Sequence, residues 1–271
     1  MQKRSIQWVN TVAYCRIIHT LGWNIVYQGD SNMMQKTLLL NGEWTIFYNP
    51  DQPSGFSILL LGGETQYVNE KTSDWMEHPG KQKIVKHMLS KGYTLFSSNL
   101  GGAHWGNNHA AELAAELYAF FIRQEIVNEK IHIIAEGTGA LLLNELVELL
   151  NGKIRSILLL NPVLSLSDRV EEEKYKKFFY KKILKEIAKA NDLTDYLVPE
   201  WIQTKEDVFI PEKIPVLIIH VLDRLEENIS GLYDDFIAVH GTTEIKYVTP
   251  EKRYIVPYQI STFFKKNEKI L

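Results

Sequence analysis

The sequence predicts an α/β fold, with a mostly parallel, doubly wound sheet and an antiparallel hairpin at the N-terminal edge. From residue 57 onward, short apolar runs alternate with longer segments of helical periodicity. Two of these runs, 58–61 and 216–219, are apolar at every position, as is typical of strands covered by helices on both faces. This alternation favours parallel strands joined by right-handed crossovers.

The chain ahead of this region predicts a short antiparallel unit. Two apolar runs within 36–48 flank Asn41-Gly42, a dipeptide that supplies the positive φ angles of a type I′ hairpin turn. Before the hairpin two interpretations stay open. The apolar residues of 17–21 are spaced as in a helix, whereas 23–28 is more typical of a strand.

The remaining elements follow in order along the chain. The expected strands are 57–63, 93–99, 131–135, 156–162, 216–220 and 244–248. Between them lie segments of helical spacing at 81–91, 108–126, 139–150 and 229–239. We therefore expect a single domain that comprises residues 1–271.

Residues 163–214 interrupt the alternation, and we expect them to form a helical cap inserted into this domain. Within the cap, 171–190 carries apolar residues at helical spacing together with seven lysines. A basic amphipathic helix can bind an anionic membrane surface or an acidic partner. We favour solvated lysines on a helix whose apolar stripe packs on the main domain, and membrane-surface binding stays a third, weaker hypothesis. The apolar stripe expected to pack on the main domain is Tyr175, Phe178, Phe179, Ile183, Leu184 and Ile187.

Composition argues against several classes of function. The formal net charge of −3 gives no global attraction to nucleic acid. With one cysteine, Cys15, the chain can form neither an intrachain disulfide nor a cysteine-based zinc site. No apolar run approaches the roughly 18 residues of a membrane helix, and no signal-peptide cleavage pattern is present, so we expect a cytoplasmic protein. The sequence has no metal, P-loop or dinucleotide motif, so no metal or cofactor is expected.

The most informative stretch is 131–150, where a buried strand leads into a tight turn of small residues and then directly into a helix. This is the strand–turn–helix context of a nucleophile elbow, whose usual pattern is G-x-S-x-G. Here the five positions, 135–139, read Ala-Glu-Gly-Thr-Gly. The central position, which carries the nucleophile in that pattern, is Gly137.

From about residue 57 to the C-terminus the chain resembles the α/β-hydrolase superfamily. The segment LLLGGE (59–64) is similar to the loop after the family's third strand, which often reads H-G-G. Residues 97–121 are similar to the region between the fourth strand and its helix in some bacterial members, and 215–224 to the strand that precedes the catalytic acid. These segments occur in the family's order, so the resemblance implies an α/β-hydrolase-like fold.

The resemblance also implies a catalytically degenerate member. The nucleophile position corresponds to Gly137, and the acid position to Asp223 or, as in some members, to Asp168. The family's histidine follows the last strand, but no histidine occurs here after His240. In a serine hydrolase, loss of the nucleophile alone costs about 10⁶ in turnover and leaves ~10³–10⁴ over water. Ordinary triad hydrolysis is therefore not expected.

Residues around the elbow remain candidates for a pocket or an oxyanion hole. The backbone N–H of Thr138, with that of Gly63 or Glu64, can bind an oxyanion. Glu136 can act as a general base on water, or it can turn aside into an ion pair, the alternative that we favour.

Histidines and one asparagine complete the candidates. His104 and Asn107 lie after a strand, where such folds place ligand-binding residues, and a role in loop architecture is an equal alternative. His132 and His220 lie within predicted strands, and we expect both to be internal histidines with satisfied hydrogen bonds.

The expected function is that of a pseudo-hydrolase, a hydrolase-like scaffold that binds a small-molecule ligand or a protein partner. Neither the ligand nor the partner is identified by the sequence. The alternative is an active hydrolase of acyl or ester substrates that activates a bound water with Glu136, His104 or Asp223.

Overall fold

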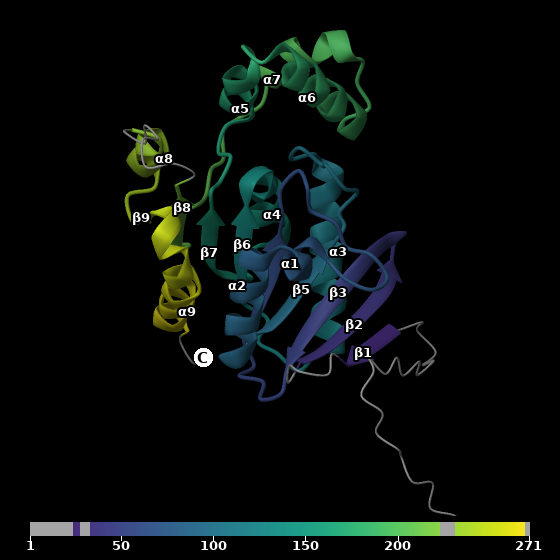
Figure 1. Ribbon diagram of the computed structural model, residues 1–271, viewed down its shortest axis with the longest axis vertical. Coiled ribbons are helices and arrows are strands. Elements are labelled where there is room, and N and C mark those ends of the chain that lie inside the picture. Colours follow the sequence, from purple (N-terminus) through teal and green to yellow (C-terminus); the bar gives the residue numbers. More distant parts are fainter. Residues whose placement is uncertain (1–23, 28–32, 223–230, 269–271) are drawn as a thin grey trace, which may run out of the picture.

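The computed structural model describes residues 24–27, 33–222 and 231–268 (Figure 1). In this part of the chain nine strands form one sheet in the order β1-β2-β3-β5-β4-β6-β7-β8-β9. The pairs β1-β2, β2-β3 and β3-β5 are antiparallel, and every later pair in this order is parallel. The predicted fold class is confirmed. The strands are β1 (Asn24–Tyr27), β2 (Met33–Leu40), β3 (Glu43–Pro50), β4 (Ser57–Leu61), β5 (Thr94–Ser98), β6 (Ile131–Glu136), β7 (Ile154–Leu160), β8 (Val216–Val221) and β9 (Glu244–Val248).

The N-terminal hairpin forms where the dipeptide predicts it. Strands β2 and β3 pair up to Leu40 and Glu43, and the two turn residues, Asn41 and Gly42, have φ of 51° and 85°. Positive φ at both central positions is the requirement of a type I′ turn, and Asn and Gly meet it with little strain. Residues 24–27 form a strand, as their sequence indicates, whereas 17–21 and Cys15 lie outside the described residues.

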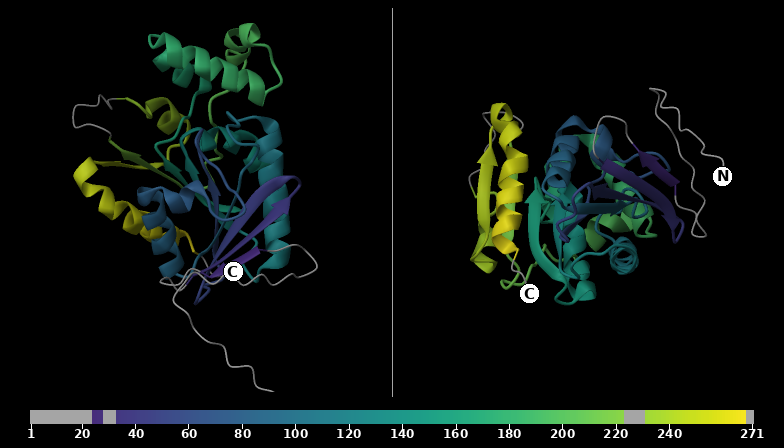
Figure 2. Two further views of the ribbon diagram at one scale, coloured as in Figure 1. Left: turned by 45° about the vertical axis from the view of Figure 1, so that its right-hand side comes forward. Right: turned by 90° about the horizontal axis from the view of Figure 1, so that it is seen from below.

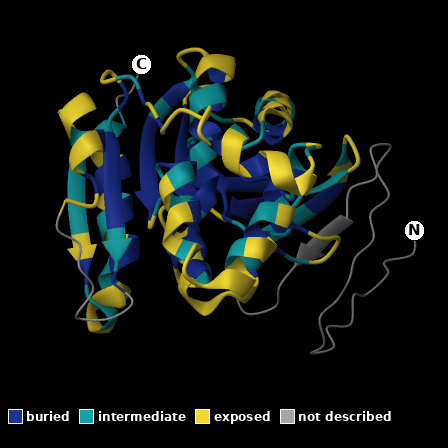
Figure 3. Cartoon of the chain, turned by 90° about the horizontal axis from the view of Figure 1, so that it is seen from above, coloured by how far each residue is buried: buried dark blue, intermediate teal, exposed yellow. Residues whose placement is uncertain are grey.

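Helices cover both faces of the sheet because the central strands are apolar on both faces. Along β4, Leu59 and Leu61 pack into the core beneath α3 and α4, while Ile58 and Leu60 pack on the opposite side against α2 and α9. All four side chains are fully buried, and the central strands are dark blue throughout Figure 3. The helices are α1 (Asp74–Glu77), α2 (Pro79–Ser90), α3 (Asn108–Gln124), α4 (Leu143–Leu150), α8 (Asp234–Val239) and α9 (Val256–Asn267).

Two predicted helices differ most from the observed limits. The segment expected as one helix over 139–150 begins as a 3₁₀ helix, η1 (Gly137–Leu142), and continues as α4. The tight turn after β6 starts this element earlier than the helical periodicity indicates. Of the helix expected over 229–239, the structure shows α8, and 229–230 lie outside the described residues.

Residues 163–214 contain helices and no strand, and they extend beyond the carboxyl edge of the sheet (Figures 1 and 2). Their elements are α5 (Leu166–Glu173), α6 (Lys177–Ala190), the 3₁₀ helix η2 (Asp195–Leu197) and α7 (Val198–Ile202). We call 163–214 the cap. Its own small core is built by Leu166, Val170, Ile183, Ile187, Val198 and Ile202, with Trp105 from the body.

The expected packing of the apolar stripe on 171–190 is wrong at its N-terminal end. Ile183 and Ile187 are buried, but Tyr175, Phe178 and Phe179 are 91%, 77% and 54% exposed. The chain turns between α5 and α6, so Tyr175 precedes α6. Phe178 lies nine positions before Ile187, which is two and a half turns of an α-helix and therefore the opposite side.

In the part of the chain that the structure describes, no helix is long and apolar enough to cross a bilayer.

Candidate functional site

The elbow lies at the carboxyl end of β6, in the middle of the sheet. Gly137 has φ of +54°, a left-handed conformation that costs glycine little and other residues more. A Cβ added at Gly139 would lie 2.7 Å from the carbonyl oxygens of Leu61 and Gly62. This close approach of the turn to the end of β4 explains why position 139 is a glycine.

Position 137, in contrast, has room for a side chain. A Cβ built on Gly137 would meet only the Cα of Gly63 within 4 Å, at an ordinary contact distance of 3.7 Å. The missing nucleophile is therefore not imposed by steric crowding. The elbow keeps the backbone shape that presents a nucleophile while its central position carries no functional group.

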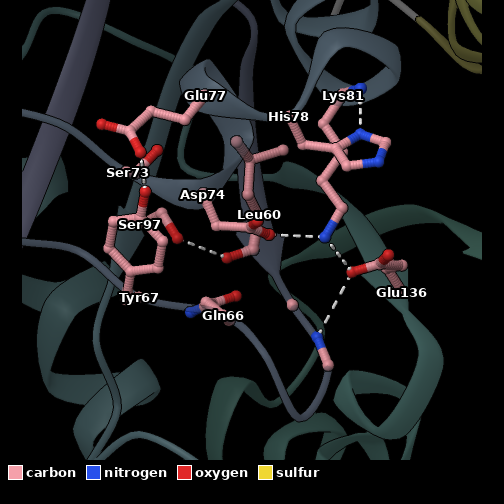
Figure 4. A network of polar contacts seen from close by, with 12 residues as sticks. Leu60, Gln66, Tyr67, Ser73, Asp74, Glu77, His78, Lys81, Ser97 and Glu136 are labelled. Atoms are coloured by element: carbon pink, nitrogen blue, oxygen red, sulfur yellow. Dashed lines mark hydrogen bonds and ion pairs between the residues drawn. The ribbon is translucent and has the colours of Figure 1, made fainter.

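Glu136, directly before this position, is held by a buried lysine. Its carboxylate accepts a hydrogen bond from Lys81 Nζ at 2.7 Å, and the same ammonium donates to the Asp74 carboxylate at 2.5 Å (Figure 4). The side chain of Lys81 is 8% exposed, that of Asp74 14% and that of Glu136 24%. The favoured ion-pair alternative for Glu136 is therefore the one that the structure contains. Sequence analysis did not identify Lys81 or Asp74, because neither belongs to a recognisable motif.

The loop after β4 approaches the elbow closely. The backbone N–H of Gly63 points to the Glu136 carboxylate at 3.4 Å, and a Cβ on Gly63 would lie 3.6 Å from the backbone nitrogen of Thr138. The two expected oxyanion donors are thus neighbours. The Thr138 hydroxyl is buried and has no hydrogen-bond partner among the described residues.

Glu64 contacts the cap. Its carboxylate pairs with Arg169 of α5 at 3.3 Å. Burial raises the pKa of Glu64, and the nearby Arg169 guanidinium only partly opposes this effect. Glu64 therefore links the loop after β4 to the first helix of the cap.

His104 is buried, and hydrogen bonds occupy both ring nitrogens. Nδ1 accepts from the backbone N–H of Gly106 at 3.1 Å, so Nε2 carries the proton that it donates to the Gly62 carbonyl at 3.3 Å. Burial lowers the pKa of His104 to about 4. The ring thus joins the loops after β4 and β5, which is the architectural alternative for this residue.

Asn107 connects the body to the cap. Its Oδ1 accepts from the backbone N–H of Ala110 at 2.7 Å and so caps α3, while its Nδ2 donates to the carbonyl of Ala190 at the end of α6 at 2.6 Å. The neighbouring Trp105 is 2% exposed and packs into the cap core. The predicted ligand-binding loop is therefore engaged in holding the cap.

A cavity of about 520 Å³ lies between the cap and the carboxyl ends of β7 and β8. The backbone N–H of Val163, one of its lining residues, donates to the Gly137 carbonyl at 3.0 Å, so the cavity begins beside the elbow. Its charged lining residues are Asp168, Arg169, Glu172, Asp207 and Asp235. Its aromatic lining residues are Phe209, Tyr233 and Phe236.

The expectation that both strand histidines are internal with satisfied hydrogen bonds is wrong, because Nε2 of His132 has no partner among the described residues and His220 is partly exposed. His132 is fully buried, bonds Ser156 Oγ through Nδ1 at 2.8 Å and stacks on Phe264, and burial lowers its pKa to about 3. His220 is partly exposed and lines the cavity, where Nδ1 and the Tyr233 hydroxyl are 2.7 Å apart. Sequence analysis missed His220 and Tyr233 as lining residues. The position of His220 at the carboxyl end of a predicted strand was the available signal.

The structure describes only one of the two candidates for the acid position. Asp168 lies in the first turn of α5, where its backbone N–H is capped by Ser165 at 3.3 Å, and it lines the cavity. Asp223 lies outside the described residues. Among the described residues, no group of three or more His, Cys, Asp or Glu side chains could hold a metal ion.

Comparison with known proteins gives structural but no sequence matches. No protein-family model matches the chain, and no curated protein does. An S-formylglutathione hydrolase from Agrobacterium tumefaciens superposes with a TM-score of 0.57 at 10% identity, over 90% of this chain and 100% of that one. Est1E from Butyrivibrio proteoclasticus gives 0.56 at 12% identity, over 88% and 99%.

An acetyl xylan esterase from Paenibacillus sp. R4 gives a TM-score of 0.55 at 12% identity, over 93% of this chain and 90% of that one. At such low identities the likeness concerns the fold alone. The order of the strands, the elbow after β6 and these structural neighbours lead to one conclusion. The chain has an α/β-hydrolase fold.

Proposed function

We propose that this protein is a catalytically degenerate member of its fold class that binds a small molecule in the cavity beneath the cap. The observation that carries the proposal is the elbow itself. Its backbone conformation is retained at Gly137, with φ of +54° and space for a Cβ, yet no nucleophile is present. Without that group, about 10⁶ in turnover is lost in hydrolases of the serine type.

The residues next to the elbow are poorly placed to replace it. Glu136 pairs with Lys81, and both ring nitrogens of His104 are engaged by backbone groups. The Thr138 hydroxyl is buried, with the residue 1% exposed. A water-based mechanism needs a base that reaches the water, and these contacts favour ligand binding over that alternative.

The cavity supports a binding function because its size suits a small organic molecule. Four carboxylates line it against one guanidinium, Arg169, which is already paired with Glu64 and Glu173. This balance disfavours anionic ligands, since a carboxylate or phosphate would meet like charge. The exposed ring of Phe209 and the buried ring of Phe236 add apolar surface for the body of a neutral or cationic ligand.

Ester hydrolysis tests the catalytic half of the proposal. The purified wild type is assayed with short- and medium-chain activated esters beside Gly137→Ser and its matched control Gly137→Ala. Both variants add a Cβ at the same positive φ, so only the hydroxyl differs between them. We expect wild type and Gly137→Ala to be indistinguishable from blank. Turnover by wild type at ordinary enzymatic rates would contradict the proposal.

Thermal-shift titration tests the binding half. A panel of cationic, neutral and anionic small molecules is compared on wild type, Asp168→Asn in the cavity and Asp195→Asn on the cap outside it. Hits among neutral or cationic compounds that weaken with Asp168→Asn alone support the cavity. If stabilising ligands are predominantly anionic, or respond equally to both variants, the assignment of this cavity is wrong.

A further inference from the structure

The outward face of α6 combines lysines with an exposed aromatic ring. Phe178 is followed at three, four, seven and eleven positions by Lys181, Lys182, Lys185 and Lys189, which places all five on one side of the helix. All five are exposed, whereas Ile183 and Ile187 on the other side are buried in the cap core. We call these five residues, Phe178, Lys181, Lys182, Lys185 and Lys189, the lysine–aromatic face.

This face is strongly positive in a chain that is negative overall. Helix α6 carries five lysines and one glutamate, a formal charge of +4, against −3 for the whole chain. Lys182 pairs with Glu186 at 3.6 Å, but within the described residues Lys181, Lys185 and Lys189 form no ion pair. Their charges are therefore available to an external partner.

Aromatic surface gathers at the N-terminal end of the same helix. The rings of Phe178 and Phe179 contact each other edge to face, with centroids 5.8 Å apart. Both rings and that of Tyr175 are more than half exposed. A monomeric protein gains nothing from holding three neighbouring aromatic side chains in water, so an apolar phase or partner is implied.

We propose that the lysine–aromatic face docks on a bilayer that contains anionic lipids. The Phe178 and Phe179 rings enter the boundary between headgroups and acyl chains, and the lysines lie against the anionic headgroups. This docking is independent of ligand binding beneath the cap, because none of the face residues lines that cavity.

Two features favour a lipid surface over an acidic protein. Every cation of α6 is a lysine and none is an arginine. Lysine acts as a flexible, strongly hydrated point charge that suits a diffuse layer of headgroups, whereas arginine forms the bidentate pairs that define a specific protein contact. The face is also the convex side of a helix, and α6 does not line the cavity between the cap and the sheet.

Co-sedimentation with vesicles tests the docking of the whole chain. Vesicles of phosphatidylcholine alone are compared with vesicles that also contain phosphatidylserine, at low and at high salt. We expect binding only to the anionic vesicles, and a marked loss of binding at high salt because exposed charges are screened. Absence of binding to anionic vesicles at low salt, or equal binding to both vesicle types, would overturn the proposal.

Variants locate the contact on this helix. Each lysine near an anionic surface raises the partition coefficient between water and membrane by a factor of about five. The double variant Lys181→Ala/Lys185→Ala should therefore lower this coefficient about 30-fold. Phe178→Ser/Phe179→Ser should lower it at least ~10-fold by removing the inserted rings. The matched control is Lys83→Ala/Lys86→Ala, which removes two exposed lysines from α2 on the body. A control that loses as much binding as the α6 variant would refute the assignment, provided that circular dichroism shows all variants folded.

Discussion

The substitution Lys81→Met probes the ion network that holds the elbow. Lys81 lies in α2 and links it to two other segments. Its ammonium contacts Asp74 of α1 at 2.5 Å and Glu136 at the end of β6 at 2.7 Å. Methionine keeps most of the side-chain volume but removes the charge. The variant therefore leaves two carboxylates facing each other with no cation between them.

The expected loss of unfolding free energy follows from the geometry of this ion network. Because both carboxylate oxygens contact the same nitrogen, at 2.5 and 2.7 Å, they lie at most 5.2 Å apart. At an effective dielectric constant of about 20, two unit charges at that separation repel by ~3 kcal/mol. Loss of one partner from a buried ion pair costs ~3–5 kcal/mol in general. Since Asp74 and Glu136 are partly exposed, we expect the free energy of unfolding to fall by about 3 kcal/mol, at the lower end of this range.

Urea denaturation near neutral pH measures the free energy of unfolding directly. Lys83→Met, an exposed lysine of the same helix, is the matched control and should change stability by less than ~0.5 kcal/mol. Adding Glu136→Gln to Lys81→Met should recover part of the loss. The reasoning is refuted if Lys81→Met lies within ~1 kcal/mol of wild type at neutral pH.

Three further outcomes follow from the structure. Burial lowers the pKa of His132 to about 3, so this side chain stays neutral in the folded state. In the unfolded state it binds a proton below its usual pKa near 6.5. The free energy of unfolding should therefore fall by about 2 kcal/mol between neutral pH and pH 5. Chemical denaturation of His132→Gln should lack this part of the pH dependence, and an unchanged dependence would contradict the assignment. Gly139→Ala should cost at least ~2 kcal/mol in thermal or urea unfolding, since its Cβ would meet two carbonyl oxygens at 2.7 Å. Gly101→Ala, whose Cβ meets nothing within 4 Å, measures instead the cost of a positive φ, which is +77° at that residue. Asn107→Ala removes both the cap of α3 and the bond to Ala190, so limited proteolysis should cleave 163–214 faster than in wild type; equal cleavage rates would show that Asn107 does not hold the cap.

Local patterns were sufficient for much of the fold. The strand at 57–61 is recognisable because four consecutive apolar residues can be buried on both faces, and Asn41-Gly42 predicts its turn because the two φ angles are a property of those residues alone. The same holds for the elbow. Its small residues at 135–139 reflect a local backbone shape, and the absence of a nucleophile at Gly137 is visible in the sequence itself.

Only the tertiary structure decided what surrounds the elbow. Glu136 and Lys81 are 55 positions apart, and nothing local relates an acid at the end of a strand to a lysine in a distant helix. The cavity likewise combines segments around 163–172, 207–210 and 232–240, which meet only when the cap has folded back on the sheet. In the cap, the sequence determined that α6 is amphipathic, but not which of its apolar residues are covered. Helical periodicity defines the faces of a helix, whereas the neighbouring elements determine which face is buried, and here they cover Ile183 and Ile187 and leave Phe178 in solvent.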